Sequence, residues 1–448
     1  MTATTPDHVP SYIADWPPVP KGPLPPGPRW PALVQSLAFM RYRHSFIPWL
    51  HRKYGDVFTV KLIPDGRQIV MFSRPEHIKE IFAGDPEVFY AGKGNAVLGA
   101  IMGEHSLLLV DSAEHKRARK LLMPAFSPRA LKGYEDMVVD IARSEVESWR
   151  DGTTFRSLDR MNAVTLEVIM KVVFGLTDET RLRELRPLLR GVINVSPAVL
   201  IGIGYPWLMK YGMWKRFVDN RDELDRALYR LIAERRAEPD LASRTDVLSQ
   251  LILVGDDEDE VPLNDAELRD QLVTLLLAGH ETTATALAWT LHELGRSREH
   301  LARARKAADE GDDAYLEAVL KESMRLHPVI PMVVRLLMQP ATIGGTEIPA
   351  GASVAPSIIL SHQENFADPD VFRPARFLDE KVQANTWIPF GGGVRRCIGA
   401  GFSLMEGVAV LREMLQRFDV VADEPDVPKV RNITSVPRHG SRITVRAR

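Results

Sequence analysis

The sequence predicts a mainly α-helical protein with a smaller β-rich lobe, and three observations favour this fold class. Strand-like segments occur near both ends of the 448-residue chain, helical patterns dominate between them, and the longest helix lies in that helical part. No linker divides the chain, although its length exceeds the usual domain size of roughly 100–200 residues. We therefore expect a Pro-rich N-terminal strap over residues 1–30 and a single domain over residues 31–448.

The composition fits a protein with a large core and excludes several classes. Hydrophobic residues make up 45% and charged residues 26% of the chain, and the net charge of −2 gives no indication of nucleic-acid binding. A single cysteine excludes internal disulfides and zinc sites built on several thiolates. No apolar stretch of about 18 residues lies near the N-terminus, so we expect no transmembrane anchor and a cytoplasmic location.

The first half of the chain contains one hairpin and then helical patterns. Residues Pro17 to Pro28 are rich in Pro and Gly and should be extended. The segment from Val57 to Phe72 alternates as a hairpin around a Pro-Asp-Gly turn. Ser127 followed by a proline predicts the N-cap and first position of a long helix.

The longest helix is predicted from Asp265 to Arg296, with Asn264 as its N-cap. At 1.5 Å per residue it spans on the order of 45 Å, enough to cross the molecule. Its middle is apolar on nearly all sides, which is typical of a buried helix. The polar segment "AGHETT" at its centre therefore needs a reason. Short strands are predicted over residues 342–356.

The glycine-rich segment "PFGGGVRRCIGAGF" surrounds the single cysteine. Phe390, Gly393, Arg395, Cys397 and Gly399 follow Phe-x-x-Gly-x-Arg-x-Cys-x-Gly spacing. A helical pattern begins directly after the cysteine, so its sulfur should lie near a helix N-terminus, which favours a thiolate. The glycines permit close approach of the backbone to the sulfur and to a bound group. A lone cysteine without these neighbours would more simply be a small buried hydrophobe.

This loop resembles the cysteine-ligand loop of the cytochrome P450 family. The resemblance implies the P450 fold, with a long central helix crossing over a haem b cofactor, and Cys397 as the iron ligand. It covers nearly the whole chain, from "LPPGPRWP" at Leu24 onward. Arg395 stands where many bacterial members carry His, so the motifs are similar to the eukaryotic-like branch without its anchor.

Three further residues are assigned a structural role by the same resemblance. Glu322 and Arg325 lie in "KESMR", and Arg376 lies in "VFRPARF". On its own, the Glu322–Arg325 pair would be a surface ion pair worth under about 1 kcal/mol. The resemblance implies instead a buried cluster of all three residues behind the cysteine loop.

The mid-helix segment is similar to the family's oxygen-activation segment. Ala278 would border the haem, and Gly279 permits a local loosening of the helix. Glu281 and Thr282 are the candidate catalytic residues, because a carboxylate and a hydroxyl can relay protons to bound dioxygen. The alternative for Thr282 is a hydrogen bond to the carbonyl four residues earlier. His280 receives no role.

Four basic residues match propionate-binding positions of the family. His115 and Arg119 are four residues apart and share a helix face. Arg335 follows the Glu322 helix, and Arg395 lies two residues before the cysteine. Two anionic propionates need several cationic donors when they are buried. The alternative for His115 and Arg119 is an ordinary charged face.

The remaining basic residues of that helix suggest an electron donor. If His115 and Arg119 face the haem, then Lys116, Arg117 and Lys120 point to solvent. We expect them to dock an acidic ferredoxin or flavodoxin that works with its own reductase. Ordinary surface charge is the alternative.

Three apolar stretches match substrate-contacting segments of the family. They begin at Ala96, at Val192 and at Val329. They favour a lipophilic substrate such as a steroid, terpenoid or fatty acid. The second stretch is either core packing or an access lid in peripheral contact with a membrane.

The function expected is a monooxygenase that inserts one oxygen atom from dioxygen into such a substrate. A peroxide-driven haem-thiolate oxygenase or isomerase is the first alternative, although such variants typically lack the acid–Thr pair. A non-catalytic haem sensor or lipid-binding protein is the second, and it would not need a proton relay.

Overall fold

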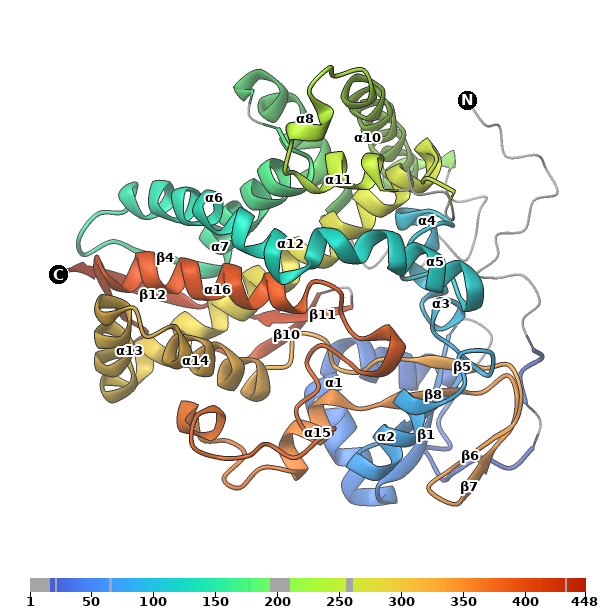
Figure 1. Cartoon of the computed structure of the whole chain (residues 1–448). Helices are drawn as coiled ribbons and strands as arrows, with labels where there is room; N and C mark the ends of the chain where they lie inside the picture. The colour runs from blue at the N-terminus through green and yellow to red at the C-terminus, as the bar shows by residue number, and fades with distance from the viewer. Residues whose placement is uncertain are drawn as a thin grey trace.

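The computed structural model describes residues 17–20, 22–63, 67–176, 178–193, 210–254, 261–431 and 433–448. Helices dominate it, and the larger sheet lies at one side (Figure 1). The helices are α1 (Ala32–Tyr54), α2 (Pro75–Ala83), α3 (Ala91–Gly94), α4 (Gly99–Met102), α5 (Ser112–Leu122), α6 (Pro128–Glu147), α7 (Ser157–Val168), α8 (Glu179–Ile193), α10 (Gly212–Arg236), α11 (Val247–Leu253), α12 (Asp265–Arg296), α13 (Arg298–Glu310), α14 (Asp313–Leu326), α15 (Ile358–Glu364) and α16 (Ala400–Leu415). The strands are β1 (Val57–Leu62), β2 (Arg67–Phe72), β3 (Phe89–Tyr90), β4 (Thr154–Arg156), β5 (Arg335–Leu337), β6 (Ala341–Ile343), β7 (Thr346–Ile348), β8 (Ser353–Pro356), β9 (Phe418–Val421), β10 (Pro428–Arg431), β11 (Thr434–Pro437) and β12 (Arg442–Ala447).

The β-rich lobe is built on a five-stranded sheet with the order β1-β2-β8-β5-β3. β1 and β2 form the predicted antiparallel hairpin, with Val57 opposite Phe72. Its turn, residues 64–66, lies outside the described residues. β2 pairs in parallel with β8, so the early hairpin is joined to the strands predicted near residues 342–356. The predicted fold class is thus confirmed.

α12 is the longest described helix and has the predicted bounds. The side chain of Asn264 accepts hydrogen bonds from the N–H groups of Ala266 and Glu267, and Glu267 caps the N–H of Asn264 in return. Most of α12 is buried, as its apolar sequence requires. Near its middle, however, Ala278 is exposed and Thr282 is half-buried. One face of α12 is therefore open at the "AGHETT" segment.

Other helix ends also follow the sequence signals. Ser127 caps α6 by accepting a hydrogen bond from the N–H of Ala130 at 3.3 Å. α14 ends at Leu326, before Pro328, and α16 begins three residues after Cys397. α16 crosses in front of α12 in Figure 1, and the hydroxyls of Thr283 on α12 and Ser403 on α16 lie 3.1 Å apart. The open face of α12 therefore lies near the start of the helix that follows the cysteine.

No helix of the described residues is long and apolar enough to cross a membrane.

Candidate active site

Cys397 lies in a tight loop that backbone hydrogen bonds hold closed. Its N–H donates to the carbonyl of Phe390 at 2.9 Å. Gly393 adopts a φ of +64°, and a Cβ at that position would lie 2.0 Å from the carbonyl oxygen of Phe82. A glycine is required there because the loop is pressed against α2 and the backbone is left-handed. The loop thus presents the Cys397 side chain, which is exposed in the protein chain.

Opposing effects act on the pKa of the Cys397 thiol. Burial among surrounding protein atoms raises the pKa of Cys397, while the N–H of Gly399 and the positive charges of Arg119 and Arg396 act to lower it. The side chain is nonetheless exposed, so it does not lie within the core. A bound metal cation removes the proton from a thiol in this position and holds the thiolate.

Behind the loop, Glu322, Arg325 and Arg376 form the buried cluster that the resemblance implied. Arg325 binds both carboxylate oxygens of Glu322, at 2.8 and 3.0 Å, and Arg376 donates to the same carboxylate at 3.3 Å. All three side chains are at most 1% exposed. Arg325 also donates to the backbone carbonyls of His362, Pro369 and Val371. The cluster therefore ties α14 to the segment that leads into the cysteine loop.

Two residues that the sequence reasoning missed connect this cluster to the loop. The Nδ1 of His362 lies 3.1 Å from the carbonyl oxygen of Arg325, and its Nε2 accepts from the N–H of Ile388 at 3.0 Å. This pattern requires a neutral imidazole protonated on Nδ1. Trp387 donates its indole N–H to the carbonyl of Lys321 on α14 at 3.2 Å. Neither residue carried a sequence signal, since both act through backbone partners distant in the chain.

Buried neutral histidines predict a loss of stability in acid. Burial lowers the pKa of His44 and His280 to about 4 and that of His362 to about 3. The unfolded chain titrates near pH 6.5, so it binds more protons than the folded protein below that pH. The stability contributed by each neutral imidazole is present above pH 6.5 and is lost as pH falls toward the folded pKa, by about 2 kcal/mol per histidine at pH 5.

The measurement is the unfolding temperature between pH 7.5 and pH 5 at constant ionic strength. The destabilisation caused by His362→Asn should shrink as pH falls, because the variant has lost one titrating group. A wild-type unfolding temperature that stays flat over this range would show that these histidines do not remain neutral in the folded protein.

The open face of α12 presents Ala278 and Thr282. The hydroxyl of Thr282 donates to the carbonyl of Ala278 at 2.6 Å, the alternative partner expected for it. This bond uses the hydroxyl proton and leaves the oxygen lone pairs available on the open face. His280 points the other way, with Nε2 3.0 Å from the carbonyl of Asn162 on α7.

Glu281 does not bond to Thr282 among the described hydrogen bonds. Its carboxylate lies 3.2 Å from the Nε of Arg431, at the end of β10. Burial raises the pKa of Glu281, and Arg431 and the hydroxyl of Thr434 counteract this effect. Arg431 therefore holds the carboxylate of Glu281 beside the open face. The two residues are about 150 positions apart in the chain, so no local sequence pattern could predict their contact.

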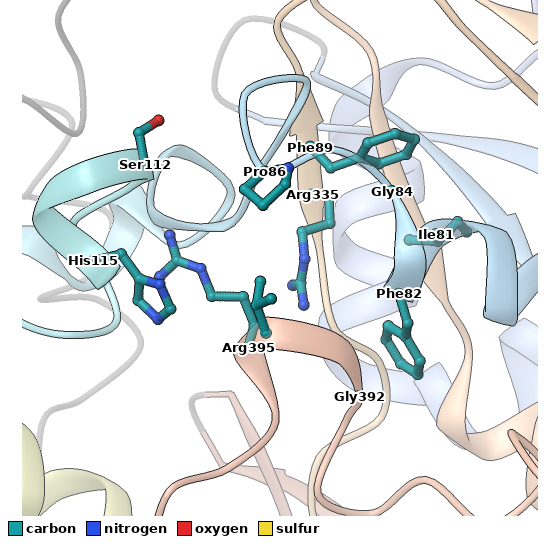
Figure 2. Close-up of a pocket in the computed structure, with 11 residues that line it drawn as sticks. Ile81, Phe82, Gly84, Pro86, Phe89, Ser112, His115, Arg335, Gly392 and Arg395 are labelled. Carbon is teal, nitrogen blue, oxygen red and sulfur yellow. The ribbon is translucent and has the colours of Figure 1, made fainter. Parts of the chain in front are cut away.

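The structure brings the four predicted basic residues together. Figure 2 shows His115 from α5, Arg335 from β5 and Arg395 from the cysteine loop converging on one place. Arg119 lies close enough to lower the pKa of Arg395 and is itself influenced by Cys397. The small cavity beside these residues measures about 20 Å³, room for about one water molecule.

These basic residues carry more positive charge than the protein around them balances. Burial, together with the neighbouring cations, lowers the pKa of His115 to about 3, and burial lowers the pKa of Arg335 and of Arg395 to about 10. Among the described residues, Asp111 is the acid that pairs with this basic group, through Arg395. The guanidiniums of Arg119, Arg335 and Arg395 set against this one carboxylate leave two positive charges. The two propionates of a haem would balance them, so the residues present fit that cofactor.

Asp111 was missed by the sequence reasoning. Its carboxylate accepts hydrogen bonds from the N–H groups of Ala91, Gly92 and Lys93 at the start of α3, and it binds Arg395. Arg395 also donates to the backbone carbonyls of Leu107 and Val110. Arg395 is therefore partly occupied by the protein, and Arg335 and Arg119 are the less engaged donors.

The prediction that Arg117 points to solvent is wrong. Its guanidinium binds the carboxylate of Glu267 at 2.6 Å and the carbonyl of Val261 at 2.9 Å. Glu267 lies in the first turn of α12, so this ion pair fastens α5 to α12. Lys116 and Lys120 are exposed, as predicted.

The fold and the cysteine loop together define a class of protein, the haem-thiolate enzymes. A sequence model described as cytochrome P450 matches residues 24–445. The chain belongs to the cytochrome P450 family, and it is therefore a haem-dependent monooxygenase, an oxidoreductase.

Its relatives include mycobacterial proteins. Cytochrome P450 135A1 of Mycobacterium tuberculosis is 52% identical over 425 residues, which cover 94% of this chain and 94% of that protein. Cytochrome P450 135B1 of Mycobacterium bovis is 40% identical over 434 residues, covering 95% and 92%. The cyanobacterial CYP120A1, solved with retinoic acid bound, superposes with a TM-score of 0.84 at 25% identity, covering 95% of this chain and 100% of that one.

Proposed function

We propose that this cytochrome P450 acts in the cytoplasm and inserts one oxygen atom from dioxygen into a lipophilic substrate of the steroid, terpenoid or fatty-acid class. The observation that carries the proposal is the open face in the middle of α12, where Ala278 is exposed and Thr282 is half-buried. The next residue, Thr283, has its hydroxyl 3.1 Å from that of Ser403 near the start of α16. A buried helix has no structural need for such a face. Residues 31–448 act as one catalytic domain, preceded by the strap over residues 1–30.

Each site residue then has a defined task. Cys397 holds the iron of haem b, which supplies the activation of dioxygen when bound. Phe390, Gly393 and Gly399 would line the bound haem from the cysteine loop, and Ala278 would line it from α12. The four basic residues His115, Arg119, Arg335 and Arg395 hold the propionates. Thr282 hands protons to the reacting oxygen, and Glu281 resupplies them.

The described parts of the substrate segments support an apolar substrate. Residues 96–102 form a short 3-10 turn and α4, which packs on α12. The stretch from Val329 to Val334 leads from α14 to β5 and carries no charged side chain. Most of the second stretch, which begins at Val192, falls in residues 194–209 and lies outside the described residues. A lipophilic molecule suits these two apolar segments better than a charged molecule does.

The test is product formation under labelled dioxygen. The purified haem protein is screened with steroids, terpenoids and fatty acids for a change in the haem absorption spectrum. Compounds that bind are incubated with a reductase system under ¹⁸O₂, and products are analysed by mass spectrometry. We expect one labelled oxygen atom in the product. Label from added peroxide alone, or an isomer without added oxygen, would support the first alternative, and binding without electron consumption would support a sensor.

We further propose that an acidic ferredoxin or flavodoxin, with its reductase, delivers the electrons at the surface of α5. Lys116 and Lys120 are exposed on this helix, and Arg396 is exposed beside Cys397. Arg119, on the same helix, is influenced by both Arg396 and Cys397, so this surface lies close to the iron ligand. Opposite charges accelerate such an encounter.

Charge reversal at this surface is expected to slow the first electron transfer. Lys116→Glu with Lys120→Glu should reduce its rate by about 10-fold or more at low salt, within the range over which charge steers encounters. The wild-type rate should itself fall as salt shortens the Debye length to about 8 Å and below. Lys215→Glu with Arg230→Glu, on α10, makes the same change in net charge and should leave the rate unchanged. Equal slowing in both double variants would place the docking surface elsewhere.

A further inference from the structure

α1 carries an apolar face that the rest of the described chain leaves exposed. Leu33, Val34, Leu37 and Met40 are each between 40 and 59% exposed, and Trp30, just before the helix, is 43% exposed. Spacings of three, four and seven residues place them on one side of the helix. The opposite side packs into the β-rich lobe. Single exposed apolar residues are ordinary, but a row of five on one face marks an interaction surface.

A cationic depression adjoins this face. It measures about 260 Å³ and is lined by Met40, Arg41, Lys429, Val430 and Arg438. The three cations are exposed, and none of them forms an ion pair with an acid of the described residues. The depression therefore combines two apolar side chains with three positive charges that the surrounding protein does not balance.

The carboxylate closest in sequence to Lys429, that of Asp426, is engaged by backbone N–H groups and by the imidazole of His439 at 3.4 Å. Asp426 accepts hydrogen bonds from the N–H groups of Val427, His439 and Ser441, at 2.8 to 3.1 Å. It stabilises the loop that carries the cations and does not contact them. Asp426 therefore does not neutralise the positive charge of the depression.

The apolar face and the cations are held in fixed relative positions. α1 is fastened to the β10–β11 hairpin by a 2.7 Å contact between the imidazole of His44 and the hydroxyl of Ser435. Arg43 donates to the carbonyl of Ile433 in the same hairpin at 3.3 Å. Lys429 lies on β10 of this hairpin, so its position relative to the apolar face of α1 is fixed.

From these observations, we infer that this surface docks the protein on a lipid bilayer that contains anionic phospholipids. The apolar side chains of α1 enter the boundary between headgroups and acyl chains, as in helices that lie in the plane of a membrane. Arg41, Lys429 and Arg438 bind headgroup phosphates, and their long stems allow the charges to stay in the polar layer. An acidic protein partner would complement the positive charges but would leave the exposed apolar side chains of α1 without an apolar surface to contact.

Docking on this side would bring lipid close to the active site. β10 begins at the depression, and its last residue, Arg431, contacts Glu281 beside the open face of α12. A substrate dissolved in the bilayer would therefore have only a short distance to travel to the site. The docking itself does not depend on the proposed reaction and can be measured without turnover.

Vesicle flotation of the full-length haem protein tests the inference. The two probes are phosphatidylcholine vesicles and vesicles of three parts phosphatidylcholine to one part phosphatidylglycerol. We expect at least about 10-fold stronger binding to the anionic vesicles, decreasing with salt. The triple variant Arg41→Glu, Lys429→Glu and Arg438→Glu should lose this preference. Leu33→Ser with Leu37→Ser should weaken binding by about 10-fold through lost apolar burial.

Matched controls separate docking from general surface effects. Val371→Ser with Leu378→Ser removes two exposed apolar residues elsewhere and should bind as the wild type does. The haem spectrum and unfolding temperature verify that every variant is folded. The inference would be overturned by equal binding to both vesicle types or by no binding to either. It would also be overturned if neither the double variant of Leu33 and Leu37 nor the triple variant of the depression changed the binding. Full competition by inorganic phosphate would also overturn it, since that outcome indicates a site for soluble anions.

Discussion

Replacing Cys397 by His is expected to abolish the red-shifted Soret band of the ferrous–CO complex completely. That band requires a thiolate on the iron, and Cys397 is the single cysteine of the chain, so no other thiol can substitute for it. Burial raises the pKa of the Cys397 thiol, and the N–H of Gly399 and the charges of Arg119 and Arg396 oppose that effect and favour the thiolate. An imidazole in this place would bind iron without the electron donation of sulfur.

The measurement is the reduced-plus-CO difference spectrum, together with haem content. Cys397→Ser serves as a second variant, because its smaller change in volume keeps the closed loop with the bond from residue 397 to Phe390. Both variants should unfold near the wild-type temperature, since the buried cluster of Glu322, Arg325 and Arg376 is untouched. A band that survives in either folded variant would mean that Cys397 is not the ligand.

The elements that the sequence predicted well are those with local signals. The capping residues Asn264 and Ser127 mark helix starts through bonds to N–H groups two or three residues away. The hairpin of β1 and β2 follows from alternation around a turn. The cysteine loop was found because its glycines and its ligand occur within a few consecutive residues. All of these signals depend on neighbours in the chain.

The contacts that the sequence could not predict join residues far apart in the chain. Arg117 was expected in solvent, but it binds Glu267, which the packing of α5 against α12 brings beside it. Glu281 is paired by Arg431, and Arg395 by Asp111, each across a tertiary interface. A single sequence contains the charges but not the partners, because the choice of partner depends on how the helices pack.

Thr282→Ala is expected to uncouple electron use from product formation while leaving haem and ligand binding intact. The Thr282 hydroxyl lies on the open face of α12, where in the proposed reaction it would receive a proton from solvent or from the Glu281 side and pass one to the reacting oxygen. General acid catalysis of this kind contributes roughly 10²–10⁴-fold, so the product formed per electron pair should fall by about 10-fold or more. Hydrogen peroxide should account for the missing electrons. Product, peroxide and reductant consumption are measured together.

The structure supplies a matched control for the alternative that Thr282 merely stabilises its helix. Thr290 donates to the carbonyl of Ala286 at 2.8 Å, the same bond to the carbonyl four residues earlier that Thr282 makes to Ala278 at 2.6 Å. Thr290 is fully buried two turns further along α12, so it has no access to the open face. Thr290→Ala should therefore change the unfolding temperature but not the coupling. Glu281→Gln, which removes the acid and keeps its shape, should slow turnover in the same direction as Thr282→Ala. If Thr282→Ala remains as well coupled as Thr290→Ala, then Thr282 is a structural residue and the protons reach the site by another route.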